Sequence, residues 1–404
     1  MKKAVMYGGG NIGRGFIGAM LSNSGYHVTF IDIAENVVNA LNERGEYPVR
    51  LVSEKGIEEL TVSNVSAVNG NDTEEAAKTI AECDILATSV GARILKFIVP
   101  NIVAGLRLRW QQTERPLNIL ICENLNDADK VFYGLLTAPL TEEEKKLFDE
   151  RVGLVECSVG RMVPVQTEAM KDGDEMRVCT EPYPYLPVDA AAFKGDIPEI
   201  KNMIPASPFD YYVKRKLFLH NLGHAVCAYL GGYTGRKYIR QSIGDADVFA
   251  LTQNAMLESA QALAKKYGVA LGELVPHIDD LLIRFGNEIL LDTCQRVGGD
   301  PARKLGETDR LIGAAKLCME QGITPANIAA GAAGAVYRYI NENGLEQTDE
   351  NAAKVLGEIS GLSSGDKLSV MIMRCYGIFR EGEALSALRM TVRKLRAENA
   401  EPAV

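Results

Sequence analysis

The sequence lacks the features that define several classes of protein. Its formal net charge is −9, so it has no basic excess of the kind that nucleic-acid phosphates attract. Nowhere do about 18 or more apolar residues follow one another, so we expect no membrane-spanning helix. The amino terminus is typical of a strand and a turn rather than of a secretory signal. We therefore expect a cytoplasmic protein with a small-molecule substrate and without nucleic-acid or membrane partners.

Cysteine pairs typical of metal sites are also missing. The 8 cysteines stand singly, no Cys-x-x-Cys pair occurs, and most lie inside apolar runs such as ILIC. This pattern is typical of reduced, buried cysteines in a cytoplasmic protein. Their spacing is unlike that of zinc ligands, so the sequence predicts no metal site.

The first half of the chain alternates strand and helix patterns. The strand patterns KAVMY, HVTFID, DILATSV and NILICEN are separated by helical ones, which predicts a doubly wound parallel sheet of the Rossmann type. The polar, β-branched segments YPVRLVS and LTVSNVSAV predict an inserted hairpin or edge strands. We expect LVECSVG and EMRVCTEPY to extend the sheet, and the helix over 92–109 to break near Pro100.

Beyond residue 198 the pattern changes to long helices. Helical patterns cover 211–232, 246–268 and 271–287, and no strand pattern occurs in this half. The proline-rich residues before Asp210 are the candidate linker. The predicted fold class is therefore α/β followed by all-α. A Rossmann-type dinucleotide-binding domain with extra strands is expected over 1–197, and a mainly helical substrate and catalytic domain over 198–404.

A glycine-rich turn follows the first strand. Its sequence, GGGNIGRG, places G-x-G-x-x-G between a strand and a helix. The first glycine permits the tight turn, the second lets a pyrophosphate approach the backbone, and the third allows close packing of helix on strand. The helix amino terminus offers unpaired N–H groups and a positive dipole end to phosphates. The sequence therefore predicts a dinucleotide site that includes Gly8, Gly10, Asn11, Ile12 and Gly13.

Asp32 ends the second strand at the spacing that this fingerprint requires. Its carboxylate would accept hydrogen bonds from the adenosine ribose hydroxyls and would repel a 2′-phosphate. No arginine or lysine follows it closely in IDIAEN, so NAD is favoured over NADP. The alternative is that Asp32 only caps the helix that begins after it.

The segment KLFLHNLGH begins a helix that is apolar on nearly every side, which predicts burial. Lys216, Asn221 and His224 nevertheless fall within one arc of about 140°. A buried lysine without a partner carboxylate has a lowered pKa and can act as a general base. Because helical side chains point toward the amino terminus, Lys216 reaches His224 only if the helix begins irregularly or bends. Alternatively, Lys216 extends to solvent and His224, like the nearby His220, is a core histidine.

This Lys-x4-Asn-x2-His pattern resembles the signature of the polyol-specific long-chain dehydrogenases, the mannitol dehydrogenase family. YGGGNIGRGFIG, PLNILICENL and RVGGDPARKLGETDRLIGAA are also similar to segments of that family, and together they span most of the chain. The resemblance implies an NAD-dependent oxidoreductase that interconverts D-mannitol 1-phosphate and D-fructose 6-phosphate by hydride transfer. It also implies a monomer that needs no metal.

The resemblance further assigns roles to residues. It implies that Lys216 is the general base and that Asn221, His224 and Asn124 hold the substrate oxygen. The segment 296–310 resembles the part of the family that closes over the substrate, and a sugar phosphate needs a basic clamp in an otherwise acidic protein. The candidates for that clamp are Arg296, Arg303, Lys304 and Arg310. The alternative is a solvated loop between helices.

One position departs from the family pattern. The chain reads VGRMVP where members commonly have Val-Asp-Arg-Ile-x-Pro, so Gly160 removes a carboxylate expected to bind substrate hydroxyls. An alternative function is therefore that of a related polyol or hexuronate oxidoreductase, such as a fructuronate or tagaturonate reductase, with a non-phosphorylated substrate. A dinucleotide-sensing regulatory protein without catalysis is the other alternative.

Overall fold

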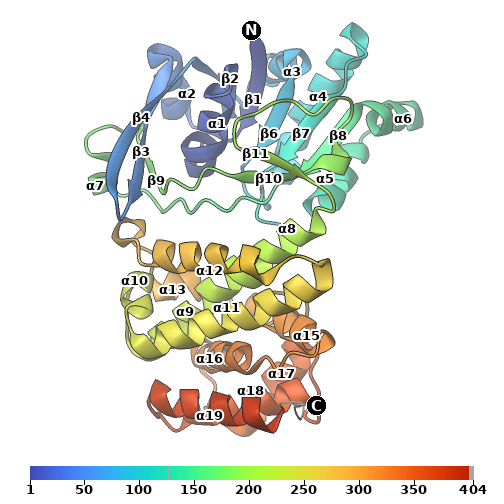
Figure 1. Cartoon of the computed structure of the whole chain (residues 1–404). Coiled ribbons are helices and arrows are strands. Elements are labelled where there is room, and N and C mark those ends of the chain that lie inside the picture. The colour runs from blue at the N-terminus through green and yellow to red at the C-terminus, as the bar shows by residue number, and fades with distance from the viewer. Residues whose placement is uncertain (126, 400–404) are drawn as a thin grey trace. The chain divides into compact units, whose positions relative to one another are not determined.

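The computed structural model describes residues 1–125 and 127–399 (Figure 1). The chain divides into two compact units, Met1–Asp210 and Tyr211–Val404, and each is described by itself. Within the described ranges, no helix is both long enough and apolar enough to cross a bilayer.

The first unit contains a six-stranded sheet in the order β5-β2-β1-β6-β7-β8. Every neighbouring pair is parallel. Counted in chain order, these six strands give the order 3-2-1-4-5-6 of the Rossmann fold, which confirms the predicted doubly wound sheet. The strands are β1 (Lys2–Tyr7), β2 (Tyr26–Asp32), β5 (Val65–Asn69), β6 (Ile85–Thr88), β7 (Leu117–Ile121) and β8 (Val152–Glu156).

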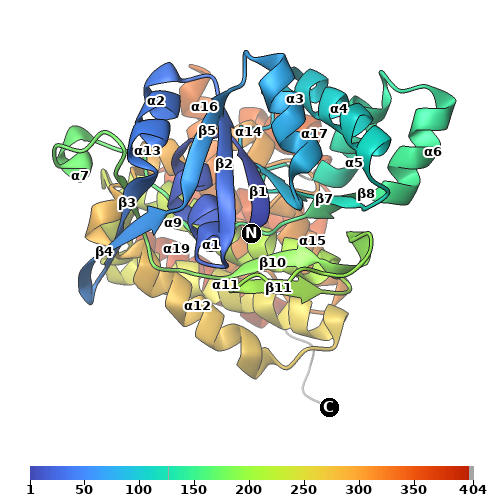
Figure 2. The ribbon, with the colours of Figure 1, turned by 90° about the horizontal axis from the view of Figure 1, so that it is seen from above.

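Alternate residues of the central strand β1 point to opposite faces of the sheet, as the two-residue period of a strand requires. Ala4 and Met6 join a core with the segment after β1 and with α2, whereas Val5 and Tyr7 join a second core with α3 to α6. Figure 2 shows α3, α4 and α5 grouped side by side. The helices are η1 (Gly13–Gly18), α1 (Ala19–Ser22), α2 (Glu35–Arg44), α3 (Thr73–Glu82), α4 (Leu95–Gln112), α5 (Ala128–Thr137) and α6 (Glu142–Arg151).

Helix α4 continues through Pro100, so the predicted break is wrong. Proline removes one helical hydrogen bond and costs roughly 3 kcal/mol inside a helix. Pro100 lies on the exposed side, where water can bond the carbonyl that is left without a partner. On the opposite side, Ile98, Ile102 and Leu106 are buried against the sheet, and their packing holds the helix together.

A smaller sheet lies outside the six-stranded one. The inserted hairpin consists of β3 (Glu46–Ser53) and β4 (Gly56–Ser63), and β9 (Val178–Thr180) pairs with β3 in parallel. The expectation that EMRVCTEPY extends the main sheet is therefore wrong, although LVECSVG does extend it as β8. Residues 188–192 pack along β8, the edge strand of the main sheet, and Val188 forms a bridge with Cys157 directly after it. This edge of the main sheet is therefore covered, and β9 cannot pair there.

A second pair of strands, β10 (Leu186–Asp189) and β11 (Met203–Ala206), also runs in parallel. Strand β11 lies beyond residue 198, where the sequence predicts no strand. Its sequence, MIPA, contains Pro205, and proline is uncommon inside strands because it cannot donate to a ladder. The local sequence therefore has only a weak preference for a strand, and it is the pairing with β10 that makes this segment a strand.

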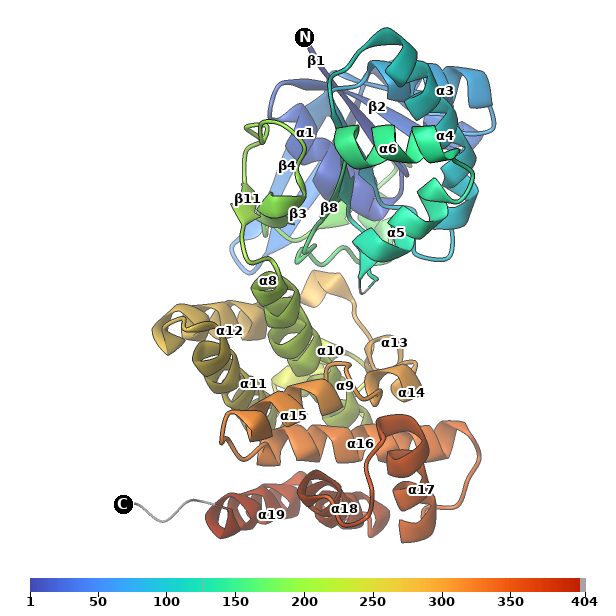
Figure 3. The same cartoon turned by 90° about the vertical axis from the view of Figure 1, so that its right-hand side faces the viewer.

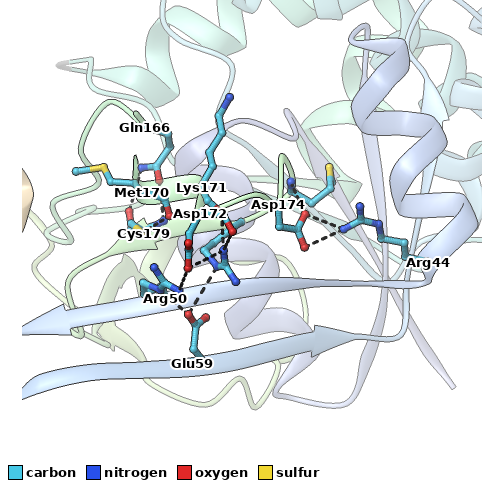
Figure 4. Close-up of polar contacts among 11 residues, drawn as sticks. Arg44, Arg50, Glu59, Gln166, Met170, Lys171, Asp172, Asp174 and Cys179 are labelled. Carbon is cyan, nitrogen blue, oxygen red and sulfur yellow. Dashed lines mark hydrogen bonds and ion pairs between the residues drawn. The ribbon is translucent and has the colours of Figure 1, made fainter. Parts of the chain in front are cut away.

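Polar contacts tie the short helix α7 (Glu168–Lys171) and its flanks to the small sheet (Figure 4). Arg50 of β3 pairs with Asp172 at 3.0 Å. Gln166 bonds both the N–H and the carbonyl of Cys179, at 2.7 and 3.0 Å, and so acts like a neighbouring strand for β9. Because the ion pair is exposed, its contribution is small, and the paired amide is the stronger constraint.

The second unit is a bundle of helices, which confirms the predicted mainly helical part. Figure 3 shows α16 (Ala326–Glu342) between α15 (Ile312–Glu320) and α18 (Lys367–Arg380). The helices α9 (Leu222–Tyr233), α11 (Ala246–Tyr267) and α16 contact one another. Small residues permit this approach: a Cβ on Gly223 would lie 2.4 Å from the Met256 sulfur, and one on Gly331 would lie 2.5 Å from Val226.

Further helices complete the unit around these. They are α8 (Asp210–Arg215), η3 (Lys216–Asn221), α10 (Ile239–Ile243), α12 (Leu271–Phe285), η4 (Glu288–Leu290), α13 (Cys294–Val297), α14 (Pro301–Lys304), α17 (Asp349–Ser360) and α19 (Leu385–Glu398).

A buried carboxyl group lies in the core of this bundle. Glu258 of α11 accepts hydrogen bonds at the start of α16, from the backbone and side-chain nitrogens of Asn327 at 3.0 and 2.6 Å and from the Ile328 N–H at 3.1 Å. Burial raises the pKa of Glu258 to about 7, although these bonds oppose the shift. Its backbone partners are N–H groups of the first helical turn, which have no acceptor within their own helix.

We predict that Glu258 makes the protein less stable as the pH rises. Its pKa is higher in the folded chain than the ordinary 4.5, so its contribution is complete below about pH 4.5 and is lost as the pH rises through about 7. Glu258→Gln should remove this slope, and it should lower the free energy of unfolding by about 1–3 kcal/mol at pH 5 because an amide accepts fewer N–H bonds. Urea unfolding between pH 5 and 8 measures both effects. The exposed Glu350→Gln is the control, and an unchanged slope in Glu258→Gln would contradict the assignment.

Candidate active site

The glycine turn after β1 has the backbone that its pattern predicts. Gly8 has φ +103°, a conformation that side chains disfavour, and a Cβ there would lie 2.6 Å from the Ser89 carbonyl oxygen. A Cβ on Gly13 would lie 2.0 Å from the Gly8 carbonyl oxygen. At Gly10 a Cβ would meet nothing within 4 Å. The fold therefore requires glycine at 8 and 13, whereas the open space at Gly10 fits the close approach of a ligand.

The residues after Gly10 lead into η1, which is a π-helix, a form that the sequence does not predict. The Asn11 amide donates to the Pro164 carbonyl at 3.4 Å, and Ile12 packs on the core. Arg14, which sequence reasoning missed, is buried and donates to the carbonyls of Gly9 at 2.7 Å and Met176 at 2.6 Å. Its guanidinium therefore fixes the turn from inside the unit.

Asp32 bonds the same turn. One carboxylate oxygen accepts the Gly9 N–H at 2.6 Å, and the other accepts the Ala34 N–H at 2.9 Å. Ala34 is the N-cap residue of α2, so Asp32 supports the start of that helix without being its N-cap. Each carboxylate oxygen retains a further lone pair, so ribose hydroxyls can bind beside these two N–H groups.

The carboxyl end of β7 carries two polar residues with different environments. Asn124 is exposed. Glu123, which sequence reasoning missed, is buried and accepts the N–H groups of Val90 at 2.9 Å and Gly91 at 2.8 Å. It therefore fixes the turn after β6, at the edge where a doubly wound sheet binds its ligands.

At the position that departs from the family pattern, an aromatic ring takes the place of a side chain. A Cβ on Gly160 would lie 3.1 Å from Cε1 of Tyr183. An aspartate at 160 would therefore require Tyr183 to move. The neighbouring Arg161 donates to the Tyr183 carbonyl at 2.6 Å, which holds this segment in place.

The helix that contains Lys216 is irregular from this residue onward, as convergence of Lys216 with His224 requires. Residues Lys216–Asn221 form the π-helix η3, and an α-helix continues from Leu222. In a π-helix the hydrogen bonds join residues five apart, so residue i lies below residue i+5. Lys216 and Asn221 are five apart, and Asn221 and His224 are three apart on the following α-helical turn. The π turn therefore gathers all three on one side, where each is half-buried.

The ring of His224 is held by its surroundings in the second unit. It stacks on Phe285 with centroids 4.8 Å apart and an angle of 11° between the planes. Its Nε2 lies 3.4 Å from Asp292. His220 is fully in the core, where burial lowers its pKa well below the ordinary value and keeps it neutral. The two histidines of the segment therefore have different environments, and among the described residues an acidic partner faces the ring of His224 alone.

The four predicted clamp residues are not equivalent. Arg296 is exposed and pairs with Asp292. Arg303 is also exposed and pairs with Asp300 at 2.9 Å. Because these side chains already have partners, their charges are partly balanced.

Lys304 and Arg310, in contrast, are buried at 5% and 9% exposure. Lys304 donates to the Gly299 carbonyl, and Nε of Arg310 donates to Asp309 at 2.7 Å. Burial, followed by repulsion from Arg310 and Arg303, lowers the pKa of Lys304 to about 8. The alternative of a solvated loop therefore does not describe these two residues, which are packed among short helices.

Two family models match the chain. The model of the mannitol dehydrogenase Rossmann domain matches residues 2–202, and that of the mannitol dehydrogenase C-terminal domain matches residues 209–371. The chain is 37% identical to a mannitol-1-phosphate 5-dehydrogenase of Bacillus subtilis (strain 168), over 92% of this chain and 98% of that protein. It is 38% identical to a protein of the same name from Shouchella clausii (strain KSM-K16), over 83% and 88%.

Solved structures share the fold at low sequence identity. A D-sorbitol dehydrogenase in substrate-free form has a TM-score of 0.78 at 14% identity, covering 96% of this chain and 94% of that one. A ternary complex of Pseudomonas fluorescens mannitol 2-dehydrogenase with NAD and D-mannitol has a TM-score of 0.75 at 15% identity, covering 98% and 94%. The curated relatives and the matched family models define an oxidoreductase. The chain belongs to the mannitol dehydrogenase family.

Gly13 and Gly10 of the turn should respond differently to the same substitution. Gly13→Ala should lower the free energy of unfolding by about 1–3 kcal/mol, because its Cβ overlaps the Gly8 carbonyl. Gly10→Ala should change it by less than about 0.5 kcal/mol, because its Cβ meets no atom. Thermal or urea unfolding of both variants tests this, and equal losses would show that the turn has a different backbone.

Proposed function

We propose that the protein is an NAD-dependent dehydrogenase that interconverts D-mannitol 1-phosphate and D-fructose 6-phosphate. The observation that carries this proposal is the π turn: Lys216, Asn221 and His224, each half-buried, lie on one side of a largely buried helix. Relatives at 37% and 38% identity that bear the name mannitol-1-phosphate 5-dehydrogenase support the choice of substrate.

In this mechanism Lys216 removes the proton of the reacting hydroxyl during oxidation and returns it during reduction. A positioned general base of this kind contributes roughly 10² to 10⁴ in rate. The Asn221 amide and the His224 ring hold the same oxygen while negative charge develops on it. Asn124, at the carboxyl end of β7, is assigned to this oxygen by the family pattern. In this mechanism the lysine, amide and imidazole side chains polarise the substrate oxygen without a metal.

The cofactor of the proposed reaction is NAD, which when bound supplies the hydride acceptor. The turn residues fit its pyrophosphate, because Gly10 has open space and the N–H groups at the start of η1 face an anion. Gly8, Asn11, Ile12 and Gly13 complete this turn. The Asp32 carboxylate would bind the ribose hydroxyls, and its charge disfavours the 2′-phosphate of NADP.

The phosphate of the substrate is assigned to the segment 296–310. Lys304, Arg303 and Arg310 bring three positive charges together, and Asp300 and Asp309 oppose them. Within the guanidinium of Arg310, Nε donates to Asp309, whereas the two terminal nitrogens have no partner among the described residues. These terminal nitrogens can therefore donate to a phosphate. An anion would relieve the repulsion that lowers the pKa of Lys304. Arg296 is the fourth candidate.

We expect rapid oxidation of NADH with D-fructose 6-phosphate and slow turnover with fructose, fructuronate and tagaturonate. The reason is that the clamp binds the phosphate, which the other three substrates lack. Initial rates for the four substrates at equal concentration test the assignment. If removal of the phosphate leaves kcat/KM unchanged, the substrate is non-phosphorylated and the related hexuronate or polyol activity replaces the proposed one.

Lys216→Ala should lower kcat by roughly 10² to 10⁴, because the general base is lost. The dissociation constant of NAD should stay the same, since Lys216 is proposed to act on the substrate alone. Lys214→Ala is the matched control: it removes a half-buried lysine from the same helix, where the ammonium lies 5.2 Å from the Phe218 ring. Equal losses of kcat in the two variants would assign Lys216 a structural role.

The KM for D-mannitol 1-phosphate should rise by roughly tenfold between pH 7 and pH 9. The free Lys304 has a pKa of about 8, so above that pH substrate binding must first restore its proton. Lys304→Arg remains charged, so its KM should stay nearly constant over this range. Other pH-dependent steps affect both proteins alike, and the difference between the two proteins is therefore the measurement. The same rise in both would remove Lys304 from the clamp.

A further inference from the structure

The candidate catalytic histidine has an acidic partner that no motif predicts. Nε2 of His224 lies 3.4 Å from Oδ2 of Asp292, while the face of the ring rests on Phe285. The first contact limits rotation within the ring plane, and the second limits tilting. Within the described part of the chain, Nδ1 has no hydrogen-bond partner, so it is the ring nitrogen that remains for a substrate oxygen.

Asp292 is itself fixed. Its side chain is 9% exposed, and its second oxygen, Oδ1, accepts from the Arg296 guanidinium. Its backbone carbonyl accepts the Ile239 N–H at 2.8 Å, and the next residue, Thr293, bridges to Tyr238. Burial raises the pKa of the Asp292 carboxyl, but His224 and Arg296 outweigh that effect, and the pKa lies below its ordinary value. The group is therefore an anion with one oxygen assigned to each partner.

A carboxylate can only accept hydrogen bonds, so the nitrogen that faces it must carry a proton. With Nε2 protonated, a neutral His224 ring has its lone pair on Nδ1. Nδ1 can then accept a hydrogen bond from a hydroxyl. With a second proton it can donate one to an oxygen anion, and Asp292 balances the charge of the ring.

We propose that Asp292, oriented by Arg296, is a positioning residue that keeps a proton on Nε2 of His224 and so presents Nδ1 to the substrate. This inference rests on the proposed function for its effect on turnover, although the protonation pattern itself can be observed without substrate. Arg296 then acts through Asp292, because it decides which carboxylate oxygen faces the histidine.

The role of Arg296 makes the effect of an amide predictable. In Asp292→Asn, the guanidinium has only donors, so it attracts the amide oxygen and turns the NH₂ group toward His224. Nε2 must then accept, and the proton of the neutral ring moves to Nδ1. If Arg296→Met is added, nothing holds the amide oxygen, which can turn back to Nε2–H. The double variant should therefore recover the original arrangement.

Nitrogen-15 spectra of the histidine rings test this on the full-length protein. The chain has only 4 histidines, so His224→Gln assigns the His224 signals by subtraction. At a pH where the ring is neutral, we expect the Nε2–H form in the wild type and in the double variant, and the Nδ1–H form in Asp292→Asn. A wild-type Nδ1–H form, or no change in Asp292→Asn, would overturn the proposal.

Turnover provides the second measurement. Asp292→Asn should lower kcat with D-mannitol 1-phosphate by about 10- to 100-fold, as loss of a group that orients an active-site ligand does. Its KM should change little. The double variant should have a higher kcat than Asp292→Asn, although it has lost one more side chain; a merely structural role would make its kcat lower.

If the ring signals change as expected but kcat does not, the positioning role is refuted. If the wild type lacks this turnover, the proposed function fails, while the spectra still test the Asp292 contact.

Discussion

The shift from four-residue to five-residue hydrogen bonds in η3 is the constraint on which the candidate catalytic group depends. A regular α-helix would separate Lys216 and Asn221 by about 140° around its axis. The π turn brings them to one side and then returns to α-helix, so that His224 follows Asn221 by one turn. π segments frequently occur at functional sites, where the gain in placing side chains offsets poorer backbone geometry.

The surroundings of this turn then decide what each polar group can do. His220 and His224 are four residues apart, yet one is enclosed in the core and the other faces Asp292. Similarly, Arg303 is exposed with a carboxylate partner, whereas Lys304 beside it is buried near two other cations. Burial and neighbouring charge, rather than residue type, therefore give side chains of the same type different environments in this unit.

In the dinucleotide turn the main constraint is steric, because the backbone leaves little room for side chains. Gly8 and Gly13 have no room for a Cβ, and Asp32, Arg14 and Glu123 secure the neighbouring backbone through its N–H and carbonyl groups. Gly10 of this turn, in contrast, has open space around its Cα, and no neighbouring atom requires a glycine there. The turn is thus rigid where the unit packs and open where a phosphate would lie.

The amino-acid sequence by itself determined the alternation of strands and helices, the glycine turn and the Lys216–Asn221–His224 spacing, because these are local patterns of period and backbone preference. It did not determine that α4 continues through Pro100 or that β9 pairs with β3, since packing and the covered β8 edge decide those outcomes. It also could not place Asp292, which is 68 residues beyond His224 in the numbering and reaches it only through the fold. Contacts between distant segments leave no periodic signal, so only the tertiary structure selected the partners of the candidate site.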